Sequence, residues 1–130
     1  MELNTKGLVT KVREIISTGT GLALKSVVTP VLPTIGDNYI AITQLGGTPT
    51  DNLCEVEYYD FTFRALIRGT TNDTSTRELA DKVFNCLHLK NGITFDSNEI
   101  IQIYAQTPVF VGKDEELRNL YNVTFRIRER

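Results

Sequence analysis

The sequence predicts one α+β domain with two main helices packed on a four-stranded mixed or antiparallel sheet, in the order helix, strand, strand, helix, strand, strand. Two observations indicate this class. Apolar residues recur at helical spacing in two separate segments, and in the strand segments they alternate with polar residues. The 130 residues have the length of one domain, so we expect residues 1–130 to form a single unit.

The first helix is predicted near the N-terminus, where five apolar residues share one helical face. Asn4 or Thr5 is expected to cap this helix, and the pair Gly19 and Gly21 is expected to end it. The apolar face consists of Leu8, Val9, Val12, Ile15 and Ile16.

A connector and two strands are predicted next. Residues 22–28 are expected to form a second short turn, and residues 29–38 contain two prolines and are expected to be irregular. Strands are expected over 39–45 and 54–68, joined by a loop over 46–52. In the second strand, Phe61, Phe63, Ala65 and Ile67 alternate with Asp60, Thr62, Arg64 and Arg68.

The second helix is predicted to begin at a capping box of Ser75 and Glu78, because this hydroxyl and carboxylate can satisfy the free amides of a first turn. The pair Asn91 and Gly92 is expected to stop it, since glycine takes positive φ freely. The apolar face of this helix consists of Leu79, Ala80, Val83, Phe84 and Leu87.

The two last strands are predicted over 99–107 and 121–128. The final strand has the strictest alternation in the chain, which indicates one buried and one polar face. Tyr121, Val123, Phe125 and Ile127 alternate with Asn122, Thr124, Arg126 and Arg128.

The composition is typical of a globular domain, with 41% hydrophobic and 23% charged residues. The net charge of −2 provides no global field toward nucleic acid or an anionic membrane, so no membrane partner is expected. Cys54 and Cys86 show no CxxC spacing and are expected to be reduced thiols. No run approaches the roughly 20 apolar residues of a membrane span, and no signal peptide is recognised, so we expect the protein to stay in the cytoplasm where it is made.

Sites for catalysis are not indicated. The stretch 19–26 looks like a phosphate-binding loop, but Leu24 replaces the second glycine and a helix precedes it, so a glycine turn is the better interpretation. His88 is the only histidine and is expected to have a capping or surface role. Asp114, Glu115 and Glu116 lack calcium-loop spacing and are expected to form a solvated acidic turn. We therefore expect no enzyme activity, no cofactor and no metal.

The arginines of the predicted strands are a candidate interaction surface. Arg64 and Arg68 share the polar side of one strand, and Arg126 and Arg128 share that of the last strand. If these strands are neighbours, four guanidinium groups line one sheet surface. Such a surface is typical of a nucleic-acid face, of a subunit interface or of simple solvation beside Asp60, and it shows no interleaved aromatic residues for base stacking.

The last third of the chain, TPVFVGKDEELRNLYNVTFRIRER, resembles a family of tailed-phage tail-completion or minor capsid proteins whose fold is similar to the tail terminator of phage lambda. Residues 39–52 and 60–89 are also similar to this family. Its members often carry glycine where this chain has Leu117, and leucine resists positive φ. The matching positions are Pro108, Phe110, Gly112, Asp114, Glu115 and Arg118, followed by 121–127.

The resemblance implies a structural virion protein in the neck or tail. It implies a ring, usually hexameric, that caps the tail tube, receives the head connector and leaves a channel for DNA. We expect the acidic loop to meet the arginine face of the next copy, so the candidate interface residues are Asp114, Glu115, Arg118, Arg64, Arg68, Arg126 and Arg128. A head-side connector or stopper protein and, from a different class, a small nucleic-acid-binding domain are the alternatives.

Overall fold

The computed structural model describes residues 4–50 and 58–130 of the chain. Along these residues, two α-helices, one short 3₁₀ helix and seven strands follow one another. They are α1 (Thr5–Thr20), η1 (Leu24–Ser26), β1 (Val27–Val28), β2 (Tyr39–Thr50), β3 (Tyr58–Arg68), α2 (Asp73–Leu87), β4 (Asn91–Phe95), β5 (Asn98–Ala105), β6 (Val109–Lys113) and β7 (Asn119–Glu129).

The strands form one mixed sheet in the order β1-β2-β3-β7-β5-β4, and β6 pairs with β7 outside this path. Only the β1–β2 pair is parallel among the described pairs. β7 is the central strand, because β3 lies along one side of it while β6 and β5 share the other side. The α+β class and the mixed sheet are confirmed.

The sheet has three more described strands than the four predicted. β1 has only two residues, and β4 and β6 have five each, so each is too short for a clear period of two. Successive apolar side chains of β6 are exposed on both sides of the strand, which removes the alternation altogether. Sequence periodicity detects strands with one buried face, and these three lack that pattern.

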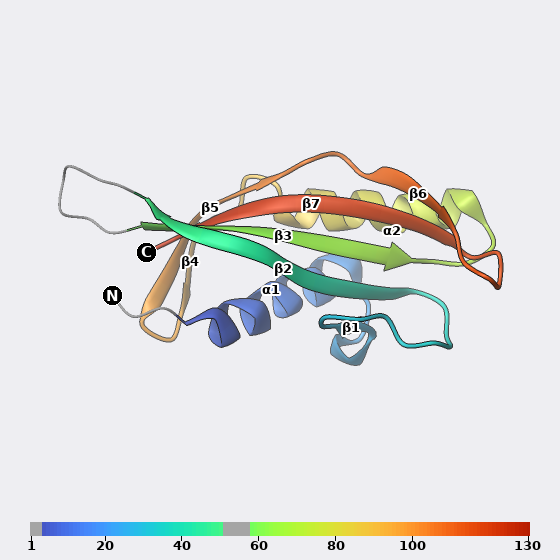
Figure 1. The fold of residues 1–130 in the computed structure, drawn as a ribbon, viewed down its shortest axis with the longest axis horizontal. Helices are drawn as coiled ribbons and strands as arrows, with labels where there is room; N and C mark the ends of the chain where they lie inside the picture. Colours follow the sequence, from blue (N-terminus) through green and yellow to red (C-terminus); the bar gives the residue numbers. More distant parts are fainter. Residues whose placement is uncertain (1–3, 51–57) are drawn as a thin grey trace.

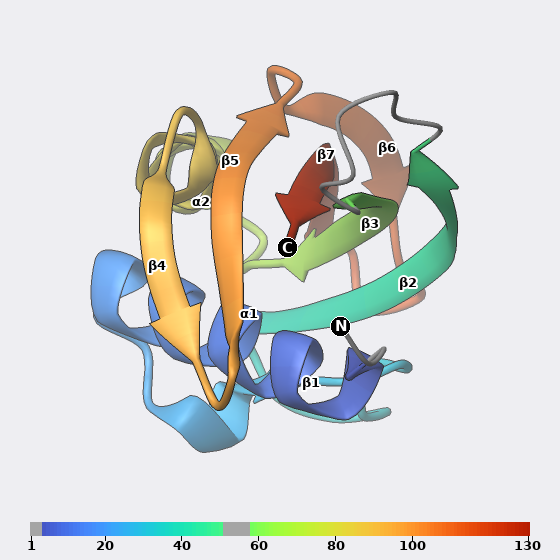
Figure 2. The same ribbon diagram turned by 90° about the vertical axis from the view of Figure 1, so that its left-hand side faces the viewer.

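Both helices pack on the same side of the curled sheet (Figures 1 and 2). α1 contacts β1 and β4, the two ends of the strand order, while α2 contacts α1, β3, β5 and β7. The core lies between the helices and the sheet. In its middle, Phe63 of β3 stacks on Phe125 of β7, with ring centroids 5.4 Å apart.

α1 begins and ends at residues with the expected chemistry. The side chain of Asn4 accepts a hydrogen bond from the Gly7 amide at 3.0 Å, and Gly21 ends the helix in the left-handed conformation with φ 78°. Gly19, however, does not end the helix as expected. It lies inside α1, and a Cβ there would come within 2.2 Å of the Cβ of Cys86, so this glycine allows α1 and α2 to approach closely.

α2 begins one turn earlier than expected. Asn72 is its N-cap and accepts a hydrogen bond from the Ser75 amide at 3.2 Å, so the predicted capping box of Ser75 and Glu78 is wrong. Its C-terminal boundary also differs from the prediction. The helix ends at Leu87, and Asn91 with Gly92 opens β4 instead of stopping the helix.

The β2–β3 hairpin is longer on its first arm than expected. β2 continues through a β-bulge after Gln44 to Thr50, so the predicted loop is wrong over residues 46–50, while 51–52 lie outside the described residues. The expected start of the next strand at 54 also lies outside them, and the described strand begins at Tyr58. The glycine pair in this stretch, typical of a loop, is accommodated at the bulge.

Candidate assembly surface

Two of the predicted interface residues, Arg68 and Arg118, are buried in one cluster. Their relative exposures are 5% and 7%. Both donate hydrogen bonds to the carbonyl oxygen of Gly36, Arg68 from Nη2 at 2.8 Å and Arg118 from Nη1 at 2.7 Å. We call these three residues the arginine clamp, because they attach the connector over 29–38 to the ends of β3 and β7.

Further hydrogen bonds hold Arg68 in the clamp. Its Nη1 donates to the Pro33 carbonyl at 2.5 Å, and its guanidinium lies over the Tyr39 ring, 5.6 Å from the centroid. Burial, and after it the charge of Arg118, lowers the pKa of Arg68 below its ordinary value. Two like charges so close together are tolerated because backbone carbonyls accept their hydrogen bonds and the carboxylates of Asp114 and Asp37 lie beside them.

Arg118 is held by the turn that precedes it. Its Nε donates to Asp114 Oδ2 at 2.8 Å, while Asp114 Oδ1 accepts from the amides of Arg118 at 2.9 Å and Glu116 at 3.0 Å. Desolvation acts to raise the pKa of Asp114, but the hydrogen bonds from Arg118 outweigh it and the pKa is lowered. Leu117 has φ 61° in this turn, so the left-handed conformation is kept without glycine.

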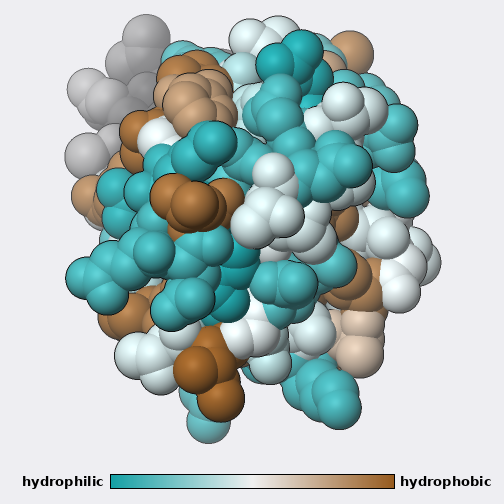
Figure 3. Space-filling view, turned by 90° about the vertical axis from the view of Figure 1, so that its right-hand side faces the viewer, coloured by the Kyte–Doolittle hydropathy of each residue, from teal (hydrophilic) through white to brown (hydrophobic). Residues whose placement is uncertain are grey.

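An apolar side chain is exposed beside the clamp. At the end of the molecule drawn in Figure 3, hydrophobic side chains lie in small separate patches among hydrophilic ones. Ile35 lies between the clamped carbonyls of Pro33 and Gly36 and is 80% exposed. Asp37 and Glu116 line the same surface hollow as Ile35, and both are exposed. Nη1 of the buried Arg118 lies 3.7 Å from Asp37, so among the described residues of this hollow Glu116 supplies the uncompensated negative charge beside the isoleucine.

The other predicted arginines lie on the face of β3 and β7 away from the helices. The strands are neighbours, with Thr62 opposite Arg126 and Asp60 opposite Arg128. Arg64, Arg126 and Arg128 are exposed there, and we call them the arginine face. Because Arg68 belongs to the clamp, three guanidinium groups lie on this face instead of four.

Two members of the arginine face are already partnered. Arg128 makes two hydrogen bonds of 2.9 Å to the carboxylate of Asp60, and the side-chain hydrogen bond lowers the pKa of Asp60. Arg126 lies over the exposed ring of Tyr104, 5.6 Å from its centroid. This tyrosine is an aromatic residue on the face that the sequence analysis missed, because it comes from β5 rather than from the two arginine strands.

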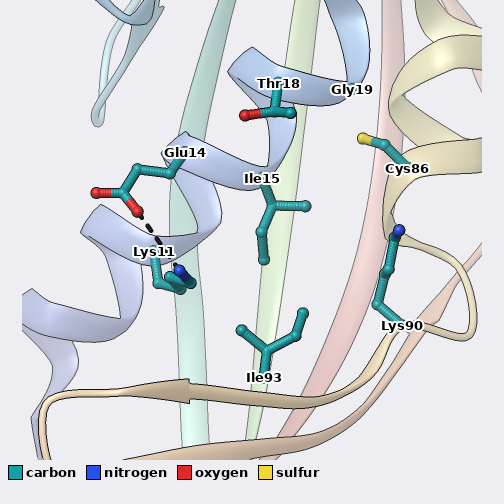
Figure 4. A pocket seen from close by; sticks show the side chains of 8 residues that line it. All are labelled: Lys11, Glu14, Ile15, Thr18, Gly19, Cys86, Lys90 and Ile93. Carbon is teal, nitrogen blue, oxygen red and sulfur yellow. Dashed lines mark ion pairs between the residues drawn. The ribbon is translucent and has the colours of Figure 1, made fainter.

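A second hollow lies between the helices, where α1 faces α2 and β4 (Figure 4). It has a volume of about 370 Å³ and an apolar floor formed by Ile15 and Ile93, which point toward each other in Figure 4. Lys11 and Lys90 lie at its margin. We call it the α1–α2 groove, lined by Lys11, Glu14, Ile15, Thr18, Gly19, Cys86, Lys90 and Ile93.

Exposed apolar residues of the connector and of β6 were not foreseen from the sequence. Ile35 stands in an irregular segment, where periodicity carries no information about exposure. Each residue of the run Val109, Phe110 and Val111 is at least half exposed. Three consecutive apolar residues after a proline could have indicated an exposed apolar patch here. The interface role of the predicted residues stays a prediction.

The described residues contain no group of three or more His, Cys, Asp or Glu side chains that could hold a metal ion. Neither described α-helix has the length and apolar character needed to cross a membrane. His88 follows α2 directly, and its Nδ1 accepts a hydrogen bond from the Ala105 amide at 3.2 Å. This histidine joins the end of the helix to β5.

Comparison with known proteins adds two findings. The family model described as bacteriophage tail terminator protein matches residues 8–128. A chain of a solved structure, the virion of a native gene transfer agent particle, has a similar fold, with a TM-score of 0.73 at 10% identity, covering 96% of each chain. No curated protein matches this sequence.

Proposed function

Because the chain belongs to the bacteriophage tail terminator protein family, and is thus a structural protein of the virion tail, we propose that it forms a ring at the head-proximal end of the tail. In this proposal the ring is a hexamer, as the resemblance to the family implies, and caps the tube made by the tail tube protein. It then receives the head–tail connector or stopper protein, and phage DNA passes through its lumen without sequence-specific contacts. Assembly takes place in the host cytoplasm.

The observation that carries the proposal is the extent of the family match. Residues 8–128 include every described helix and strand except the first three residues of α1 and the last residue of β7, so the match concerns the whole fold and not one motif. The similarity to a chain of a virion particle supports the same fold, again over almost the entire chain.

The surface supports a role in assembly. A closed ring of identical subunits needs two different complementary patches on each subunit. The chain offers an acidic end around the clamp and an arginine face on β3 and β7. Glu115 and Arg64 are exposed members of these two surfaces and remain candidates for contacts between copies.

Loss of the gene in the phage that encodes this chain tests the proposal. Without a terminator, tail tubes should form with irregular and excessive lengths and should not join to filled heads. A head-side stopper, the nearest alternative, would instead leave tails of normal length while filled heads lose their DNA. Tail lengths measured by electron microscopy on the mutant particles, with complementation as the control, separate these outcomes.

The nucleic-acid-binding alternative is tested separately on the purified protein. The arginine face has three exposed guanidinium groups, of which Arg128 is paired with Asp60. Affinity for a DNA duplex that falls steeply with salt would favour this alternative, because displaced counterions make phosphate binding salt-dependent. The proposed function predicts no measurable duplex binding at physiological salt.

A further inference from the structure

We propose that Ile35 of one copy inserts into the α1–α2 groove of the next copy and so forms the contact that closes the ring. This inference rests on the proposed ring but adds the two surfaces that meet. It concerns a second copy of this chain, and it is argued from the apolar and charge complementarity of two surfaces.

The first surface is an exposed apolar side chain on a backbone that is held in place by hydrogen bonds. Ile35 is 80% exposed, although backbone carbonyls on both sides of it are bound by the buried guanidinium groups of Arg68 and Arg118. Two buried charges are costly to accommodate, and here their hydrogen bonds go to the connector that carries Ile35. Because the backbone at Ile35 is already held, binding there costs little further loss of backbone freedom, which favours an energetic anchor.

The second surface is a hollow of fitting chemistry. Ile15 and Ile93 form the floor of the α1–α2 groove, and Cys86 extends it along α2 (Figure 4). Gly19 shapes its upper end, since any larger residue would collide with Cys86. A volume of about 370 Å³ leaves room for an aliphatic side chain and part of its loop.

The charges around the two surfaces are opposite. Asp37 and Glu116 flank Ile35, but Asp37 lies 3.7 Å from Nη1 of Arg118, so Glu116 carries the uncompensated negative charge among the described residues of that hollow. Lys11 and Lys90 flank the groove. Glu14 also lines the groove and is paired with Lys11 at 3.6 Å, so Lys90 carries the uncompensated positive charge among the described residues of this lining. Opposite charges at the margin of an apolar contact orient the partners and set their register.

The two surfaces lie on different sides of α1. Arg13 donates to the carbonyls of Val27 and Leu24, so this side of the helix faces β1 and the start of the connector. Ile15 and Thr18 face the opposite way, toward α2 and β4. One copy can therefore offer its connector to one neighbour and its groove to another, which is the head-to-tail arrangement that a ring requires.

Matched substitutions test the contact in the purified protein. Ile35→Asp should raise the concentration at which rings form by about tenfold or more, as expected for loss of an anchor residue. Val31→Asp is its control, because Val31 is on the same connector and 75% exposed but lies outside the clamp. Lys90→Glu and Glu116→Lys should each weaken assembly, because each brings like charges together. The double variant should assemble as the wild type does, since its charges are again opposite. Ring populations are measured by mass photometry, and circular dichroism checks that each variant is folded.

Cross-linking tests the geometry directly. One protein carries Ile35→Cys and a differently sized tagged protein carries Thr18→Cys, both with Cys54→Ser and Cys86→Ser. Under oxidation the mixture should give a disulfide-linked dimer of mixed size. If wild-type rings form but this mixed dimer is absent and Ile35→Asp assembles normally, the contact is wrong while the proposed function stands. If wild-type protein forms no ring either free or on tail tubes, both the contact and the ring are overturned.

Discussion

Glu129 provides a sharp test of the packing at the C-terminal end of β7. Its side chain is fully buried, and its Oε1 accepts a hydrogen bond from Asn98 Nδ2 at 2.8 Å. Oε2 has no hydrogen-bond partner among the described residues. Burial, only partly offset by the Asn98 bond, raises the pKa of Glu129 from 4.5 to about 7. The carboxyl group is thus more stable in its protonated form within the fold.

The raised pKa makes stability depend on pH in a defined direction. Below about pH 4.5 Glu129 is protonated in both folded and unfolded chains, so its contribution is fully present. As pH rises to about 7 the unfolded chain ionises first, and the folded state loses about 3 kcal/mol relative to it. Above that range both states are ionised and the loss is complete.

Glu129→Gln removes this titration and keeps the shape of the protonated carboxyl group. The variant should therefore be more stable than the wild type by up to about 3 kcal/mol at pH 8, and nearly equal to it at pH 4.5. The measurement is the free energy of unfolding in urea at several pH values. The value for the wild type is subtracted from that for the variant at each pH, so that the contributions of the other titrating groups cancel. Glu115→Gln, which removes an exposed carboxylate, is the control and should leave the difference near zero.

A difference between Glu129→Gln and the wild type that stays constant over this pH range would refute the reasoning. So would a variant that is less stable at pH 8, because it would show that the ionised carboxylate has favourable partners in the folded chain.

Three further predictions concern stability. Gly19→Ala should lower the free energy of unfolding by about 1–2 kcal/mol, since the new Cβ collides with Cys86 and the gain in helix propensity is smaller, whereas Thr18→Ala in the same turn should be nearly neutral in urea unfolding. Leu117→Gly should raise the free energy of unfolding by about 0.5 kcal/mol, because removing the strain of a leucine with positive φ outweighs the entropy cost of glycine. The thermal midpoint should rise slightly, and an unchanged or lower midpoint would contradict this. Arg118→Met should lower the free energy of unfolding by about 3 kcal/mol and speed amide hydrogen exchange in the connector. Exchange as slow in the variant as in the wild type would show that the clamp does not hold the connector.

The long elements could be predicted from the sequence because each has one buried face. The alternation of Phe63 and Ala65 with polar residues, and the stripe through Leu8 and Val12, correspond directly to the core. The short strands could not be found, since a strand of five residues such as β6, exposed on both sides, produces no periodic pattern. A predicted helix start was wrong where two residues can both cap the helix. Asn72 caps α2, although Ser75 and its neighbours fit the capping pattern better.

The candidate surface was predictable only in part. The strand patterns place Arg64 and Arg126 on the polar sides of their strands, but leave open whether the strands are neighbours; the structure pairs β3 with β7 and so brings the two arginines to one face. The different position of Arg68 could not be foreseen. Its alternation places it with the exposed arginines, but the connector folds over it and turns a surface residue into a buried one. Burial by an irregular segment depends on tertiary structure that no local pattern records.

The measurement that tests the central claim most directly is antibody-gold labelling of purified phage particles whose genome encodes this chain. The account predicts label confined to the junction between head and tail, and on free tails confined to the end that would meet the head. Label distributed along the tail or at its distal tip, or absent from every particle, would contradict the assignment of the chain to a terminating ring.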